Sequence, residues 1–260
     1  MRDQGLKDAI RAAGGVGSLA RSIGISQPSV SNWSRVPADR VLSVEKATGV
    51  DRAALRPDLY DVQPSSPALD EVDAARAQEY ALLATLLARA PDEPLLGRIA
   101  KLHGDATALG VAHAALAEAA SRADVARLEH EYFNLFIGLG RGELLPYGSY
   151  YLSGFLHERP LARLRAHLSR LGIERAHGQS EPEDHAAILC EIMSGLASRR
   201  YEASAETERK VFEQHLAPWI GRFFADLERA EAADFYRSVG ALGRVFVEIE
   251  TQAFALPTSA

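Results

Sequence analysis

Helical periodicity without an alternating strand pattern is the feature that most restricts the fold of this chain. Leucines recur three and four positions apart, as in Leu83, Leu86 and Leu87, which places them along one face of an α-helix. Valine and isoleucine are scattered, and no segment alternates apolar and polar residues as a half-buried strand does. The sequence therefore predicts an all-α protein.

A polar stretch divides the helical pattern into two parts. Residues 61–70 contain two prolines and two serines and lack a helical period, so they are predicted to be a linker. We expect a small domain over residues 1–60 and a larger one over residues 71–257. The larger domain is predicted to pack as one helical globule. Its helices are expected at residues 71–89, 94–103, 107–120, 122–137, 160–171, 182–202, 206–229 and 232–254.

Charge is distributed unevenly over a chain whose formal net charge is −6. Residues 1–60 hold nine Lys or Arg against six Asp or Glu, whereas the remainder holds 20 against 29. A basic first domain can approach a polyanion, and an acidic second domain can attract a basic partner.

The sequence lacks the features of exported and membrane proteins, and this indicates the cellular compartment. Cys190 is the one cysteine, so no intramolecular disulfide can form, which favours a reducing compartment. No apolar run approaches the roughly 20 residues that cross a bilayer. The first residues have no apolar core of the secretory type. We therefore expect a cytoplasmic protein.

Residues 16–33 have the spacing of a helix-turn-helix. Leu19 and Ala20 face inward, Gly24 supplies the positive φ of a tight turn, and Ser26 is placed to cap the second helix. Asn and Gln on the outer edge can pair with adenine, and Arg with guanine or phosphate. The outward residues that we predict to contact DNA are Arg21, Gln27, Ser29, Ser31, Asn32 and Arg35.

Residues 5–60 as a whole resemble the Cro-like, YdaS-type helix-turn-helix family, including the VPADRVL helix start and the LRPDLY ending. The resemblance implies binding to double-stranded DNA. The alternative is a helix-turn-helix retained for folding or protein contact, because the second helix carries little positive charge.

Three segments of the larger domain are rich in aromatic or ionisable residues. The first is EYFNLFIGLG at 131–140, followed by LPYGSYY at 145–151. The second is SEPEDH at 180–185, in which Ser180 and Glu183 have capping-box spacing and Pro182 suits a first helical turn. The third is HLAPW at 215–219.

Together these segments resemble the TorD/DmsD family of molybdoenzyme chaperones. The resemblance implies a TorD-like helical domain that binds an apo-molybdoenzyme precursor, such as a formate dehydrogenase or a reductase, and its twin-arginine signal peptide during cofactor insertion. By position, it implies a peptide-binding site formed by Tyr147, Tyr150, Glu181, Asp184 and His185. From spacing alone, Asp184 is better explained by the helix dipole and His185 by burial in a core, and the resemblance makes the functional interpretation equally favoured.

The leading hypothesis is thus a cytoplasmic chaperone with a DNA-binding regulatory head. The rival is a transcriptional regulator whose helical C-terminal domain is a sensor or dimerisation module. An enzyme is not expected, because no nucleophile–base pair or phosphate-binding loop is recognisable, and no metal or cofactor is expected. Family members can exchange helices to dimerise, so the resemblance leaves a homodimer open.

Overall fold

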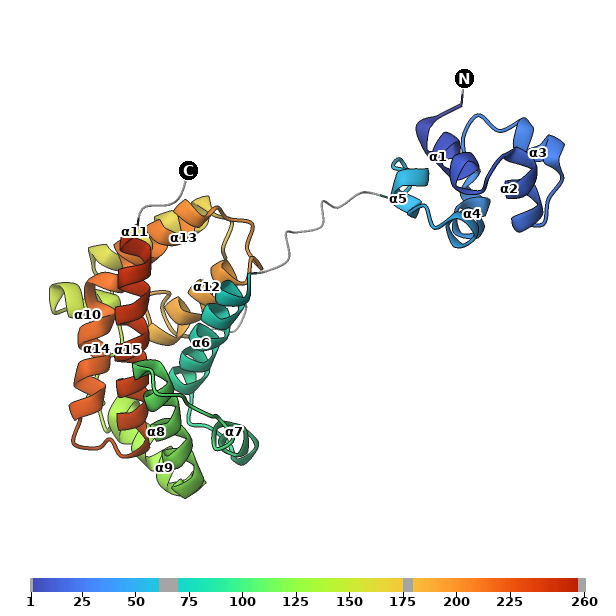
Figure 1. Cartoon of the computed structure of the whole chain (residues 1–260). Coiled ribbons are helices and arrows are strands. Elements are labelled where there is room, and N and C mark those ends of the chain that lie inside the picture. Colours follow the sequence, from blue (N-terminus) through green and yellow to red (C-terminus); the bar gives the residue numbers. More distant parts are fainter. Residues whose placement is uncertain (1, 61–69, 175–179, 257–260) are drawn as a thin grey trace. The chain divides into compact units, whose positions relative to one another are not determined.

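The computed structural model describes residues 2–60, 70–174 and 180–256 (Figure 1). Contacts between Cα atoms divide the chain into two compact units, residues 1–68 and 69–260, which are described separately. The predicted linker lies outside the described residues except for Asp70. The described residues form helices and no strand, so the predicted all-α class is confirmed. None of the described helices is both long and apolar enough to cross a membrane.

The first unit consists of short helices around a small core. Five α-helices and the 3-10 turn Ala38–Arg40 make up this unit, and the α-helices are α1 (Gln4–Ala12), α2 (Val16–Ser22), α3 (Gln27–Ser31), α4 (Val41–Thr48) and α5 (Arg52–Leu55).

Helices α2 and α3 form the predicted helix-turn-helix. Leu19, Ala20 and Val30 are buried in the core of the unit. Gly24 lies in the turn with φ 71°, a conformation that residues with a Cβ atom rarely adopt. The hydroxyl of Ser26 accepts the N–H of Ser29, so the predicted cap of α3 is confirmed.

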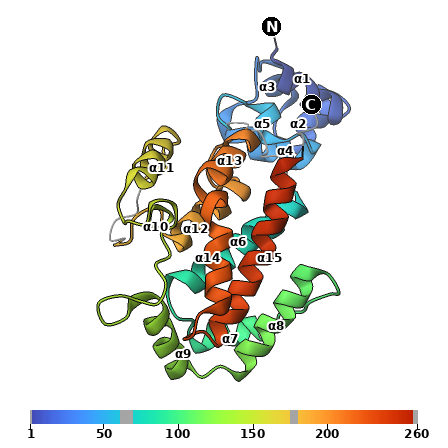
Figure 2. The ribbon, with the colours of Figure 1, turned by 90° about the vertical axis from the view of Figure 1, so that its left-hand side faces the viewer.

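The second unit is a larger helical bundle. Its α-helices are α6 (Glu71–Ala88), α7 (Glu93–Ile99), α8 (Ala108–Arg122), α9 (Val125–Tyr132), α10 (Gly148–Ser153), α11 (Arg159–Arg170), α12 (Ala186–Ala197), α13 (Ala205–Val211), α14 (Ala217–Arg229) and α15 (Phe235–Ala255). Helices α14 and α15 run side by side (Figure 2), and α12 packs along α6.

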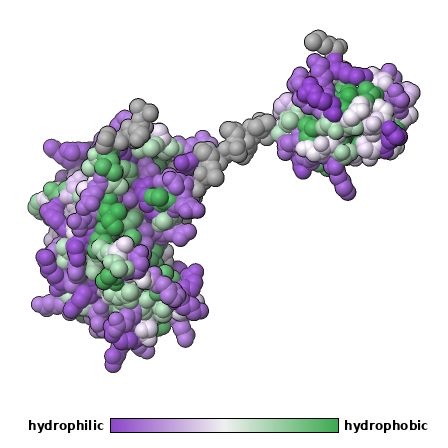
Figure 3. All heavy atoms as spheres, in the orientation of Figure 1, coloured by the Kyte–Doolittle hydropathy of each residue, from purple (hydrophilic) through white to green (hydrophobic). Residues whose placement is uncertain are grey.

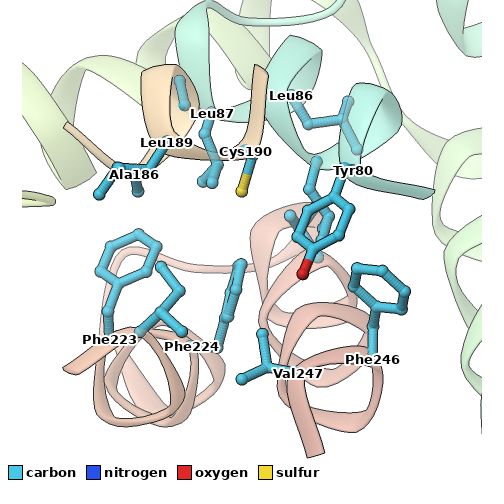
Figure 4. Close-up of a cluster of buried hydrophobic side chains, with 14 of the residues drawn as sticks. Tyr80, Leu86, Leu87, Ala186, Leu189, Cys190, Phe223, Phe224, Phe246 and Val247 are labelled. Atoms are coloured by element: carbon cyan, nitrogen blue, oxygen red, sulfur yellow. The ribbon is translucent and has the colours of Figure 1, made fainter. Parts of the chain in front are cut away.

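The main core lies between these two helix pairs (Figure 4). Side chains from α6 and α12 point toward aromatic and aliphatic side chains from α14 and α15. Cys190 lies in this core, and burial raises the pKa of its thiol to about 12, so the thiol stays protonated. The face drawn in Figure 3 carries many hydrophilic residues, with hydrophobic residues exposed in places on each unit.

Several helix boundaries differ from the prediction. The predicted helices 122–137 and 206–229 each contain a π-helical segment, at Phe133–Ile137 and at Phe212–Leu216. Pro218 follows the second segment, and its missing N–H explains why the regular helix is interrupted there. Helix α10 was not predicted, because six residues are too few to show an apolar stripe.

Candidate peptide-binding groove

Two segments that lie far apart in the sequence pair at the start of α12. The N–H of Gly148 donates to the carbonyl of Asp184 (2.9 Å), and the N–H of Ala186 donates to the carbonyl of Pro146 (2.8 Å). A Cβ atom on Gly148 would lie 2.9 Å from Nε1 of Trp219, so a side chain there would clash with the indole on α14. These bonds fix the turn at Glu183 and Asp184 and the extended residue His185 just before α12.

The predicted capping box of Ser180 and Glu183 is wrong. Helix α12 begins at Ala186, so Pro182 does not lie in its first turn. Glu183 instead accepts a hydrogen bond from Nε of Arg165 on α11, at 2.8 Å. The start of α12 is fixed instead by hydrogen bonds between the two paired segments. A capping box, which joins residues three positions apart, does not provide such long-range bonds.

Asp184 caps α10. Its Oδ2 atom accepts the N–H of Ser149 at 2.7 Å, and the residue is 3% exposed. Its other oxygen, Oδ1, has no hydrogen-bond partner among the described residues. The side chain lines a cavity of about 390 Å³ between α10, α11 and the start of α14.

His185 caps α12. Its Nδ1 atom accepts the N–H of Ala187 at 3.1 Å, which places the proton of the neutral ring on Nε2. Burial lowers the pKa of His185 to about 4. The ring packs edge-on against Tyr147, with 5.1 Å between ring centroids. The imidazole is therefore neutral near pH 7 and fixed in orientation.

Tyr147 connects His185 to an exposed carboxylate. Its hydroxyl donates to Oε2 of Glu181 at 2.6 Å. Burial, followed by the hydrogen bond to Glu181, raises the pKa of Tyr147, so it remains a donor. Three of the five residues that the family resemblance implies thus form one contiguous cluster.

The other two residues of that set lie elsewhere. Tyr150 accepts a hydrogen bond from Arg141 at 2.9 Å, and the guanidinium lies 5.4 Å from the ring centroid. Asp184 faces the cavity under α10, as described above. The consecutive pair Asp184 and His185 therefore line two different hollows.

His185 and Glu181 line a hollow of about 720 Å³ between α6 and α12. A second hollow, of about 300 Å³, lies between α11 and α12 and shares Ile188 and Glu191 with the first. We refer to the two hollows, which meet at Ile188 and Glu191, as the α12 groove. Its size is typical of a site that receives a small ligand or several side chains.

The charge of the larger hollow is nearly balanced. Its lining includes the carboxylates of Glu181 and Glu191 and the guanidinium groups of Arg89 and Arg200. The expectation of a uniformly acidic second domain is therefore too simple at this site. Acidic and basic groups lie at defined positions along one groove.

Among the described residues, no cluster of three or more His, Cys, Asp or Glu side chains could hold a metal ion.

The predicted DNA-contacting residues of the first unit lie on its exterior, with Gln27, Ser29 and Asn32 on or directly after α3. The guanidinium of Arg21 bonds within its own helix, whereas Arg35 forms an ion pair with Asp58 at 3.2 Å. The six predicted residues, all exposed, are Arg21, Gln27, Ser29, Ser31, Asn32 and Arg35.

Residues 102–225 match the family model described as nitrate reductase delta subunit, which covers more than half of the second unit. The chaperone protein TorD of Vibrio cholerae is 27% identical over 130 residues, covering 46% of this chain and 59% of the relative. The chaperone protein YcdY of Escherichia coli is 30% identical over 121 residues, covering 46% and 61% respectively. The second unit is similar to the TorD family of chaperones.

Two further comparisons concern the fold and the first unit. A crystal structure described as a redox enzyme maturation protein from Archaeoglobus fulgidus is 26% identical, covers 66% of this chain and 93% of that chain, and has a TM-score of 0.46. Residues 6–64 match the family model described as bacterial toxin YdaS. The chain spans about three fifths of the length of these two curated TorD-family relatives.

Sequence reasoning missed several residues that line the groove. Tyr132 packs against the core of the second unit and also lines the larger hollow. Glu191 is the one charged residue of α12. A single charged residue in an otherwise apolar helix could have indicated a functional position from the sequence. Arg89 and Arg200 lie beyond the ends of their helices, where no periodic pattern marks them.

Proposed function

We propose that this protein is a chaperone for a redox enzyme of the apo-molybdoenzyme class, and that the α12 groove holds the twin-arginine signal peptide of the precursor. The observation that carries the proposal is the groove itself, with Glu181 and His185 in one wall and Tyr147 in contact with both. Kinship with curated chaperones supports the functional class. The proposal assigns the protein to the cytoplasm, where such precursors are assembled before export.

The groove suits a peptide that combines arginine with apolar residues. Glu181 donates no proton and accepts from Tyr147 through one oxygen, which leaves the carboxylate able to accept from a guanidinium. Glu191 provides a second carboxylate further along the groove. Ile188, which also lines the groove, provides a surface for apolar contact. Arg89 and Arg200 would repel a guanidinium in the wrong position, which restricts how the peptide lies.

The fixed geometry of the wall also favours binding. Tyr147 and His185 are held by hydrogen bonds and burial before any peptide arrives. A preorganised wall loses little side-chain entropy on binding, so more of the contact energy appears as affinity.

The test uses the full chain and a fluorescent peptide with two consecutive arginines followed by an apolar stretch. Replacing both carboxylates (E181Q and E191Q together) is expected to weaken binding by about 10-fold, since two charge-assisted contacts are lost. E129Q, on the exposed side of α9, is the matched control and should leave affinity unchanged. Equal affinity of the double variant and the wild type would overturn the groove assignment.

A second function is favoured by the first unit. We infer that its helix-turn-helix binds double-stranded DNA, because the outer edge of α3 is polar and exposed. Residues 6–64 match the model described as bacterial toxin YdaS, the family whose resemblance implied DNA binding. Arg2, which sequence reasoning missed, donates to the carbonyl of Ser31 at 3.0 Å and adds a cation beside α3. Arg21 adds another on α2.

A mobility-shift assay at a stated salt concentration distinguishes sequence-specific DNA binding from purely electrostatic binding. N32A should reduce affinity for a selected operator by about 10-fold while leaving binding to random DNA unchanged. Equal loss on both DNAs, or none on either, would argue against base readout by Asn32.

The alternative function is a transcriptional regulator whose helical second unit is a sensor or dimerisation module. Pull-down of a molybdoenzyme precursor, with and without its leader, distinguishes the two functions. The chaperone proposal expects capture of the precursor by the full chain, with weaker capture after the leader is removed.

A further inference from the structure

The cavity under α10 shares no lining residue with the α12 groove. It is lined by Leu152 of α10, by Arg159 and Arg163 of α11, and by Asp184 and His215, and it measures about 390 Å³. We call this the α10–α11 cavity.

Asp184, one of the residues that line the α10–α11 cavity, has an unsatisfied hydrogen-bond acceptor. Asp184 is 3% exposed, and its Oδ1 atom has no partner among the described residues. A buried carboxylate oxygen without a donor is unfavourable, so a donor that reaches it gains a strong, charge-assisted bond. The cavity therefore favours a group that carries an N–H or O–H.

The mouth of the cavity carries two guanidinium groups. Arg159 and Arg163 lie four positions apart on α11, and both are exposed. Neither forms an ion pair with any part of the chain that the structure describes. Two arginines without an ion-pair partner, on a helix that contains no Asp or Glu, form a local basic site for an anionic group.

An apolar rim adjoins these arginines. Leu152, Phe155 and Leu156 are 42%, 70% and 40% exposed, within one short stretch between α10 and α11. The turn is held by Ser153, whose hydroxyl donates to the carbonyl of Phe155 at 3.2 Å. A fixed group of large apolar side chains at the surface is typical of a protein contact site.

We propose that the α10–α11 cavity and its apolar rim dock an acidic, apolar peptide segment of a partner protein. Acidic side chains of the segment pair with Arg159 and Arg163, apolar side chains cover Phe155, and an N–H of the segment reaches Asp184. An anionic membrane is a poorer fit, because a flat lipid surface would cover the recessed carboxylate without donating to it. This surface has the opposite charge preference to the α12 groove and goes beyond the proposed function.

The test is selection of a displayed library of random 12-residue peptides against the immobilised full chain. Selected clones should include peptides that combine Asp or Glu with Phe or Leu. The strongest such peptide, labelled with a fluorophore, should bind the double variant R159E and R163E at least 10-fold more weakly. F155S should weaken it about 5-fold, since Phe155 is largely exposed and its loss leaves the core intact.

R98E, on the exposed side of α7, is the matched control and should bind this peptide as the wild type does. The proposal is overturned if no acidic peptides are selected, or if the R159E and R163E variant binds them equally. Binding to phosphatidylglycerol vesicles without peptide binding would overturn it in favour of a membrane. Because E181Q and E191Q should leave this peptide unaffected, failure here is distinguishable from failure of the α12 groove.

Discussion

Asp184 and His185 are consecutive in the chain, yet Asp184 caps α10 and His185 caps α12. The carboxylate of Asp184 accepts the N–H of Ser149, and the imidazole of His185 accepts the N–H of Ala187. The two residues therefore join the start of one helix to the start of another. One wall of the α12 groove and part of the lining of the α10–α11 cavity depend on this junction.

Removal of the Asp184 side chain should destabilise the fold. D184A leaves the N–H of Ser149 buried without an acceptor, which lowers the free energy of unfolding by about 1–3 kcal/mol. Urea unfolding followed by circular dichroism measures the change. E183Q is the control, because Glu183 pairs with the exposed Arg165 and should contribute less than about 1 kcal/mol. Equal effects of the two variants would contradict the cap.

His185 should make stability fall as the solution becomes acidic. Its folded pKa of about 4 lies below the unfolded value of 6.5, so the unfolded chain binds more protons between these values. The stabilisation is fully present above pH 6.5 and is lost as pH falls toward 4, by about 3 kcal/mol at most. In urea unfolding at pH 7 and pH 5, H185N should show a smaller decrease than the wild type. An unchanged decrease would show that His185 does not titrate as described.

His113 should have the opposite pH dependence. It lies 2.9 Å from Glu79, and the hydrogen bond to that carboxylate raises the pKa of His113. This stabilisation is fully present below pH 6.5 and is lost as pH rises through the raised pKa. H113Q should therefore destabilise the protein by about 1 kcal/mol at pH 6, and by less at pH 8.5. A loss that is the same at both values would rule out a charged His113.

Glu131 should be important for the start of α15. Its carboxylate accepts three backbone N–H groups, from Asp234 (2.8 Å), Phe235 (3.2 Å) and Tyr236 (2.7 Å). E131A should lower the free energy of unfolding by about 1–3 kcal/mol, because partly buried donors lose their acceptor. E129A, two residues away and exposed, should change it by less than about 0.5 kcal/mol. Chemical unfolding of both variants provides the comparison.

The helices could be predicted where the pattern is local. Leu19, Gly24 and Ser26 identify the helix-turn-helix because each acts within a few residues of its own position. The long helices α6 and α15 were likewise predicted from the spacing of their apolar residues and from the residues that end each helix.

The site was less predictable because its structure depends on distant contacts. Ser180 and Glu183 match a capping box, but α12 begins only at Ala186, where hydrogen bonds to Pro146 and Gly148 hold the chain. No local pattern shows that a segment will pair with residues more than 30 positions away. For the same reason, sequence reasoning placed Asp184 and His185 in one site, whereas they line separate hollows.

The central claim is that the α12 groove receives the leader of a client protein. A photoreactive amino acid introduced at position 188, in the groove, tests it directly with the intact precursor. Position 111, where Val111 is exposed on α8, is the control. The account predicts a crosslink from position 188 to the leader peptide and none from position 111. Equal crosslinking from both positions, or a crosslink from position 111 alone, would contradict it.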